Sequence, residues 1–110
     1  MPAVPKIEFL WWEECPSWDR ALEMLREAMR EEGLDPESVA MSEIETDDDA
    51  QRIEFPGSPT IRIDGADFQP PAADAPRGLT CRVYRLRDGR ASPLPDPQDL
   101  REALRKARDG

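Results

Sequence analysis

A hydrophobic stretch that leads directly into an amphipathic helix constrains this chain more than any other feature. Residues 6–12, Lys-Ile-Glu-Phe-Leu-Trp-Trp, alternate at their start and become continuously apolar at their end. This pattern predicts a strand whose later half is buried on both faces and is therefore central in a sheet. Residues 16–32 then place apolar side chains at three- and four-residue steps, with a proline in the first turn and Gly33 at the end.

Cys15 lies between this strand and this helix, in the segment Cys-Pro-Ser-Trp at positions 15–18. Backbone N–H groups at a helix N-terminus favour the thiolate, so this position can lower the pKa of a thiol. Glu13 and Glu14 favour the neutral thiol, and no lysine or histidine is near in the sequence. Cys15 is therefore the candidate nucleophile, and opposing influences act on its charge.

The residue composition restricts the possible chemistry to thiols and carboxylates. The 110 residues carry a net charge of −9 and include two cysteines and no histidine, which excludes His-based metal sites and Ser-His-Asp or Cys-His arrangements. An acidic chain without a basic patch is not expected to bind nucleic acid or an anionic membrane surface. No apolar run is long enough to span a membrane, and residues 1–6 do not resemble a secretory leader. We expect one cytoplasmic domain, residues 1–110, with no metal and no cofactor.

The rest of the chain alternates between strand and helix patterns. Three further strands are predicted at residues 38–44, 60–63 and 80–86, and two further helices at residues 47–53 and 96–108. Thr46 and Asp96 are the expected N-caps of those two helices. Three prolines in residues 66–79 predict a surface loop.

This order predicts an α/β fold of the form βαβαββα, with a four-stranded mixed sheet and helices on both faces. A right-handed crossover makes the first two strands parallel, and residues 60–63 and 80–86 are expected to pair antiparallel. That pairing would place Cys81 well over ~10 Å from Cys15, beyond the ~7 Å Cα separation that a disulfide allows. We therefore interpret Cys81 as a small buried residue of a strand, and retain it only as a possible resolving thiol.

Two motifs in this order resemble the thioredoxin-like fold. They are the Cys-Pro-x-x segment after the first strand and Gly-Ser-Pro-Thr at 57–60 before the third, followed by a late Cys-Arg at 81–82. Short bacterial thioredoxin- or glutaredoxin-like proteins are similar over residues 6–107. The resemblance implies that Pro59 is cis and lies beside Cys15, where the neighbouring backbone pairs with an incoming peptide or thiol substrate. Dithiol members have a second cysteine three residues after the first, whereas this chain has Trp18.

Three functional hypotheses follow. In the first, Cys15 is the single nucleophile of a thiol–disulfide oxidoreductase or a peroxide-reducing protein, and an external thiol or Cys81 resolves the intermediate. In the second, the fold is catalytically idle and binds a partner protein through a groove of tryptophan and cis-proline. In the third, Cys15 and Cys81 handle a soft metal or an organomercurial, which their predicted separation argues against. The predicted substrate-binding residues are Trp12, Trp18, Ser58, Pro59 and Thr60.

Overall fold

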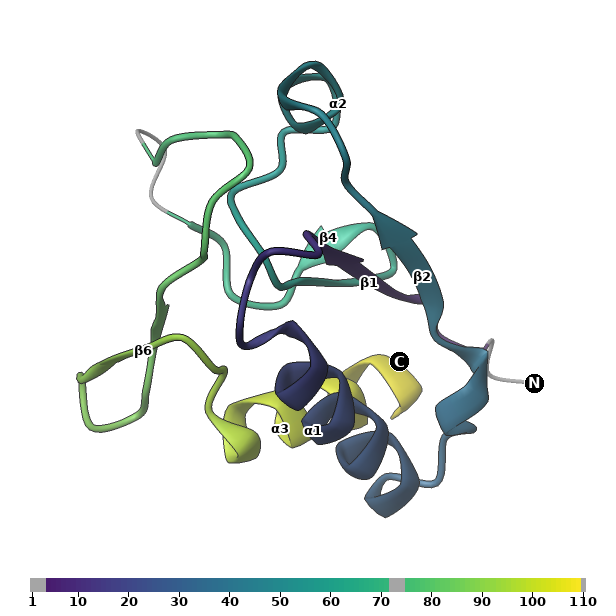
Figure 1. The fold of residues 1–110 in the computed structure, drawn as a ribbon. Helices are drawn as coiled ribbons and strands as arrows, with labels where there is room; N and C mark the ends of the chain where they lie inside the picture. Colours follow the sequence, from purple (N-terminus) through teal and green to yellow (C-terminus); the bar gives the residue numbers. More distant parts are fainter. Residues whose placement is uncertain (1–3, 72–74, 110) are drawn as a thin grey trace.

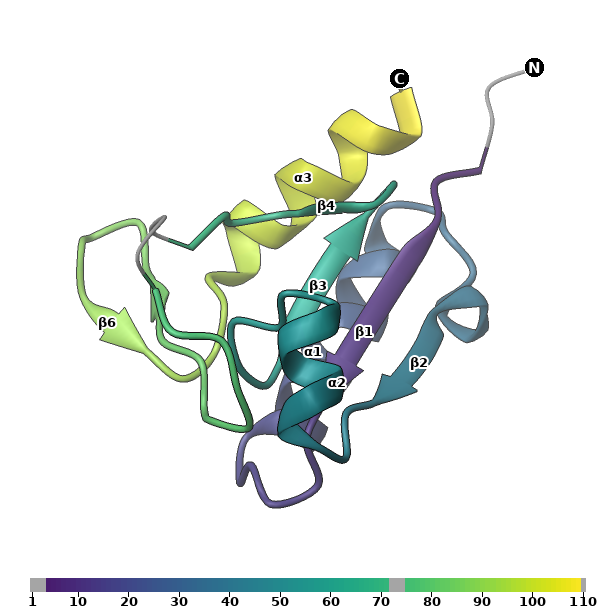
Figure 2. The same cartoon turned by 90° about the horizontal axis from the view of Figure 1, so that it is seen from above.

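The apolar strand predicted near the N-terminus is an inner strand of the sheet. In the computed structural model, which describes residues 4–71 and 75–109, it forms β1 (Ile7–Trp11). The sheet has the order β2-β1-β3-β4, in which β2 is Ala40–Glu43, β3 is Thr60–Ile63 and β4 is Ala66–Asp67 (Figures 1 and 2). β1 is parallel to β2, as predicted, and antiparallel to β3.

The side chains of β1 contribute to two hydrophobic cores, one on each face of the sheet. The helices are α1 (Trp18–Glu31), α2 (Asp47–Arg52) and α3 (Pro97–Asp109). Phe9 and its cross-strand partner Ile61 pack with α1 and α3, whereas Leu10 packs with α2 and Phe55. Because successive strand residues face opposite sides, one strand anchors both layers. Figure 1 shows α2 on one side of the sheet, and α1 with α3 on the other.

Capping side chains explain where two of the helices begin. The Thr46 hydroxyl accepts a hydrogen bond from the Asp49 N–H at 3.1 Å, which begins α2. The Asp96 carboxylate accepts from two backbone N–H groups in the first turn of α3. Ser17 is the N-cap of α1, but its side chain makes no capping hydrogen bond.

The fourth strand of the sheet is not the predicted one. Residues 80–86 were expected to pair with β3, and residues 66–79 were expected to be loop. Instead, a tight turn at Asp64 and Gly65, both with positive φ, returns the chain at once, so that β4 pairs with β3. Part of the expected strand, β5 (Tyr84–Arg85), pairs with β6 (Ala91–Ser92) in a separate two-stranded sheet. Residues 72–74 of the expected loop lie outside the described residues.

The helices are short compared with the thickness of a membrane. The longest, α1, has 14 residues, whereas a membrane-spanning helix needs about 20 apolar residues. In the described part of the chain, no helix is both long enough and apolar enough to cross a membrane.

We expect Thr46→Ala to lower the free energy of unfolding by about 1 kcal/mol, because the Asp49 N–H then loses its acceptor. Urea denaturation followed by circular dichroism measures this change. Ser42→Ala, which removes an exposed hydroxyl from β2, is the matched control and should have little effect. Equal losses in the two variants would contradict a capping role for Thr46.

Candidate functional site

Cys15 is buried in the turn between β1 and α1, where only 2% of its surface is exposed. Its backbone N–H donates to the Trp12 carbonyl at 3.0 Å, which closes this turn. Its Sγ lies 3.3 Å from the Ser58 carbonyl oxygen and 3.4 Å from the Ser17 Oγ. The Ser58–Pro59 peptide bond is cis, so the prediction of a cis proline beside Cys15 is confirmed.

Burial raises the pKa of the Cys15 thiol, but hydrogen bonds outweigh it. Ser17 donates through its hydroxyl and its backbone N–H, and the Ser58 hydroxyl and the Cys81 thiol also contribute. Together they hold the pKa of Cys15 below that of an ordinary thiol, which favours the thiolate. The neutral thiol donates instead to the Ser58 carbonyl, so the protonation state decides which partners the sulfur engages.

The Ser17 hydroxyl is therefore part of the thiol environment rather than a helix cap. It lies beside the Cys15 sulfur, and α1 begins without the usual capping bond from its N-cap side chain. The sequence pattern did not indicate Ser17 as a residue of the site. The only signal was its type, because a serine at the expected start of a helix is normally interpreted as a cap.

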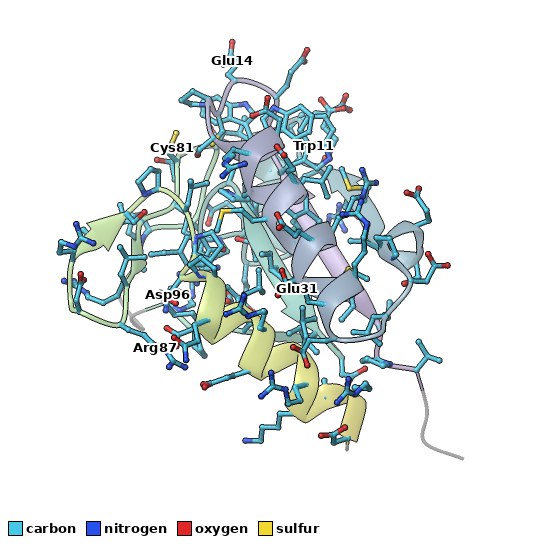
Figure 3. The ribbon with its side chains drawn as sticks, turned by 90° about the horizontal axis from the view of Figure 1, so that it is seen from below. Trp11, Glu14, Glu31, Cys81, Arg87 and Asp96 are labelled. Atoms are coloured by element: carbon cyan, nitrogen blue, oxygen red, sulfur yellow. The ribbon has the colours of Figure 1, made fainter. Side chains whose placement is uncertain are left out.

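The structure corrects the location and the burial of Cys81. The residue is exposed, and it forms an isolated parallel bridge with Ser58, so its segment runs beside the cis-proline turn. The strand pairing on which the predicted separation from Cys15 rested is wrong, because β3 pairs with β4 and Cys81 pairs with Ser58, whose carbonyl oxygen lies 3.3 Å from the Cys15 sulfur. Figure 3 shows Cys81 at the same end of the molecule as Glu14, which lies in the turn that carries Cys15.

The two thiols influence each other in opposite directions. Burial raises the pKa of Cys81, and its hydrogen bond to Cys15 and the negative charge of Cys15 raise it further. The Cys81 thiol in turn lowers the pKa of Cys15 by hydrogen bonding. The site therefore favours a thiolate at Cys15 and a protonated thiol at Cys81.

The two predicted tryptophans lie on opposite faces of the sheet. Trp18 stacks on Trp11, with ring centroids 4.1 Å apart, and packs against the core beneath α1 and α3. Trp12 packs against the core beneath α2, together with Leu79. Both side chains are half-buried, and their role in substrate binding stays a prediction.

The predicted docking residues Ser58, Pro59 and Thr60 are buried, and the chain itself uses their polar groups. The Thr60 hydroxyl donates to the Gly57 carbonyl at 2.7 Å. The Pro59 carbonyl accepts from the Tyr84 hydroxyl at 2.6 Å. A substrate-binding role for these three residues stays a prediction, and it requires contacts other than these.

The burial of Arg82 is the feature of this region that the sequence pattern indicated least. Residues 80–86 alternate as a strand predicts, but Cys81 was interpreted as the buried residue, rather than Arg82 or Tyr84. In the structure both are buried, and Arg82 pairs with Asp67 at 2.5 Å. The alternation predicts that every second residue of the segment is buried, which is correct. Which of the two faces is buried depends on the distant Asp67, the partner of Arg82.

The described residues contain no group of three or more cysteine, aspartate or glutamate side chains that could hold a metal ion. Comparisons with protein-family models, with curated proteins and with solved structures found no match. The site itself therefore carries the functional argument.

We expect Ser17→Ala to raise the pKa of Cys15, because the thiolate loses a hydroxyl donor. The ultraviolet absorbance of the thiolate, followed against pH in a Cys81→Ala background, measures this pKa. Ser42→Ala in the same background is the control. The free energy of unfolding should change less in Ser17→Ala than in Thr46→Ala, because only Thr46 caps its helix. An unchanged pKa in Ser17→Ala would exclude its hydroxyl from the thiol environment.

Proposed function

We propose that this chain is a thioredoxin-like thiol–disulfide oxidoreductase of the cytoplasm that uses Cys15 as its nucleophile. The observation that carries the proposal is the Cys15 sulfur itself, which lies beside a cis proline among hydrogen-bond donors that lower its pKa. The order of the sheet and the position of Cys15 between β1 and α1 support the thioredoxin-like assignment.

The chemistry follows from the charge of the sulfur. The thiolate is the form that attacks a disulfide, so a lowered pKa increases the reactive fraction near neutral pH. The attack forms a mixed disulfide at Cys15 and releases one thiol of the substrate. The sulfur partners, two hydroxyls, a backbone N–H and a thiol, are neutral hydrogen-bond donors, and they stabilise the thiolate without a counter-ion.

The alternative of an idle binding module has less support. That hypothesis needs an accessible groove at the cis proline, whereas Ser58, Pro59 and Thr60 are buried. Binding of a soft metal ion or an organomercurial gains support, because Cys81 pairs with Ser58, whose carbonyl oxygen lies 3.3 Å from the Cys15 sulfur. Soft thiolate ligands select such metals, so this binding is the second candidate function.

The pH dependence of alkylation tests the proposed nucleophile. Iodoacetamide labelling of the reduced protein, resolved residue by residue by mass spectrometry, gives separate rates for Cys15 and Cys81. For Cys15 we expect the rate to reach half its maximum below the ordinary thiol pKa of about 8.5. For Cys81 we expect the half-maximum at a higher pH than for Cys15, because its pKa is raised.

The half-maximal pH does not depend on how freely the reagent reaches a buried sulfur, because access scales the rate at every pH. Free cysteine measured under the same conditions is the reference. If the alkylation rate of Cys15 reaches half its maximum at a pH equal to or above that of free cysteine, the proposal is contradicted.

A further inference from the structure

Residues 80–82 pair with the backbone of Ser58. The Ser58 N–H donates to the Thr80 carbonyl at 2.8 Å, and the Ser58 carbonyl accepts from the Arg82 N–H at 2.8 Å. An extended peptide that adds to a strand edge makes this kind of main-chain pair. Residues 80–82 therefore occupy the edge on which a peptide substrate was expected to dock.

Buried polar contacts hold this segment in place. The guanidinium of Arg82 pairs with Asp67, hydrogen-bonds to the Gln69 carbonyl, and lies 4.4 Å from the centroid of the Tyr84 ring. The Tyr84 hydroxyl bonds to the Pro59 carbonyl. The segment is thus tied to β4, to the residues after it and to the cis-proline turn.

Gly57 allows the segment to approach this closely. A Cβ at position 57 would lie 3.0 Å from the Arg82 backbone nitrogen, and the φ of Gly57 is +127°. Both the close approach and the positive φ favour glycine. The backbone of the Gly-Ser-Pro-Thr motif is therefore matched to residues 80–82.

The pairing places Cys81 where the reacting sulfur of a docked peptide would lie. Residues paired across neighbouring strands project their side chains to the same face, so Cys81 and Ser58 share a face. The Cys15 sulfur lies 3.3 Å from the carbonyl of that same Ser58. Cys81 is also exposed, whereas Cys15 is buried, so a small reagent that approaches the pair meets Cys81 first.

We infer that Cys81 is the resolving thiol of Cys15, presented by a strand of the chain itself, and that the substrates are low-molecular-weight disulfides rather than docked polypeptides. This inference rests on the proposed function. A small disulfide needs no strand edge, and the edge is already paired.

The reaction balances as two thiol–disulfide exchanges. The Cys15 thiolate attacks one sulfur of the disulfide RSSR, the S–S bond breaks, and the first RS⁻ leaves and takes up a proton. Cys81 then loses its proton and attacks the Cys15 sulfur, and the second RS⁻ leaves and is protonated. Two electrons pass from the protein to the substrate, so that one RSSR becomes two RSH and the protein keeps a Cys15–Cys81 disulfide.

Oxidation by glutathione disulfide tests the inference, with intact-protein mass as the readout. The reduced wild-type protein should lose two hydrogens, release two glutathione molecules per chain and carry no lasting adduct. Cys81→Ser should instead keep one glutathione on Cys15, and Cys15→Ser should form no intramolecular disulfide. Cys81 is exposed, so its replacement leaves the core intact.

The outcomes separate the two proposals. A lasting adduct in the wild type, to the same extent as in Cys81→Ser, overturns the role of Cys81 and leaves Cys15 as a single nucleophile. If neither protein acquires an adduct or a disulfide, the proposed function and the inference both fail. Failure to oxidise together with tight binding of one Hg²⁺ by the two thiols favours the soft-metal function and overturns the inference.

A second variant tests the strand that presents Cys81. Arg82→Met keeps an apolar stem and removes the pair with Asp67, and Arg85→Met removes an exposed arginine from the same segment as a control. We expect the effective concentration of Cys81 at Cys15, measured from the equilibrium with glutathione, to fall about tenfold or more in Arg82→Met only. Equal effective concentrations in both variants would overturn the role of the anchored strand.

A comparison of two oxidants tests the substrate class. A disulfide-bonded polypeptide, such as insulin, should be a much poorer oxidant of the reduced wild-type protein than glutathione disulfide at equal concentration. Comparable rates for the two oxidants would overturn the assignment to small disulfides.

Discussion

The buried guanidinium of Arg82 determines how the second half of the chain lies against the first. The side chain is only 4% exposed, and Asp67 supplies its counter-charge from β4. Removing one partner of a buried ion pair typically costs roughly 3–5 kcal/mol, because the remaining charge is left unpaired. The segment before Arg82 is therefore confined to one path, and that path runs along Ser58.

The thiol pair results from this path. Residues 15 and 81 are far apart in the sequence, and they meet because the cis-proline turn contacts both segments. The thiol with the lowered pKa is the buried one, and the exposed thiol has the raised pKa. A thiolate enclosed in this way is shielded from bulky reagents, and susceptibility to oxidation follows exposure as well as charge.

Local patterns predicted the parts of the fold that depend on neighbouring residues. The apolar run of β1, the stripe of α1 and the caps Thr46 and Asp96 each lie within a few residues of the structure that they specify. The cis Pro59 was predicted from a resemblance in the order of the motifs, and the peptide bond confirms it.

The errors concern contacts between distant residues. The alternation in residues 80–86 could not show that Arg82 faces Asp67, which lies 15 residues earlier. β4, which directly follows the turn at Asp64 and Gly65, was assigned to a loop because prolines follow. Once β4 was missed, residues 80–86 were assigned to its place, and Cys81 was separated from Cys15.

Amide hydrogen exchange at Ser58 and Arg82 in the reduced protein measures directly whether residues 80–82 pair with the backbone of Ser58. Both N–H groups donate across the pairing of Ser58 with residues 80–82, so both should exchange slowly and to a similar degree. The amide of the exposed residue Asp88, in the turn between β5 and β6, should exchange quickly. Rapid exchange at Arg82, while the amides of β1 and β3 remain protected, would contradict the claim that the chain fills its own docking edge.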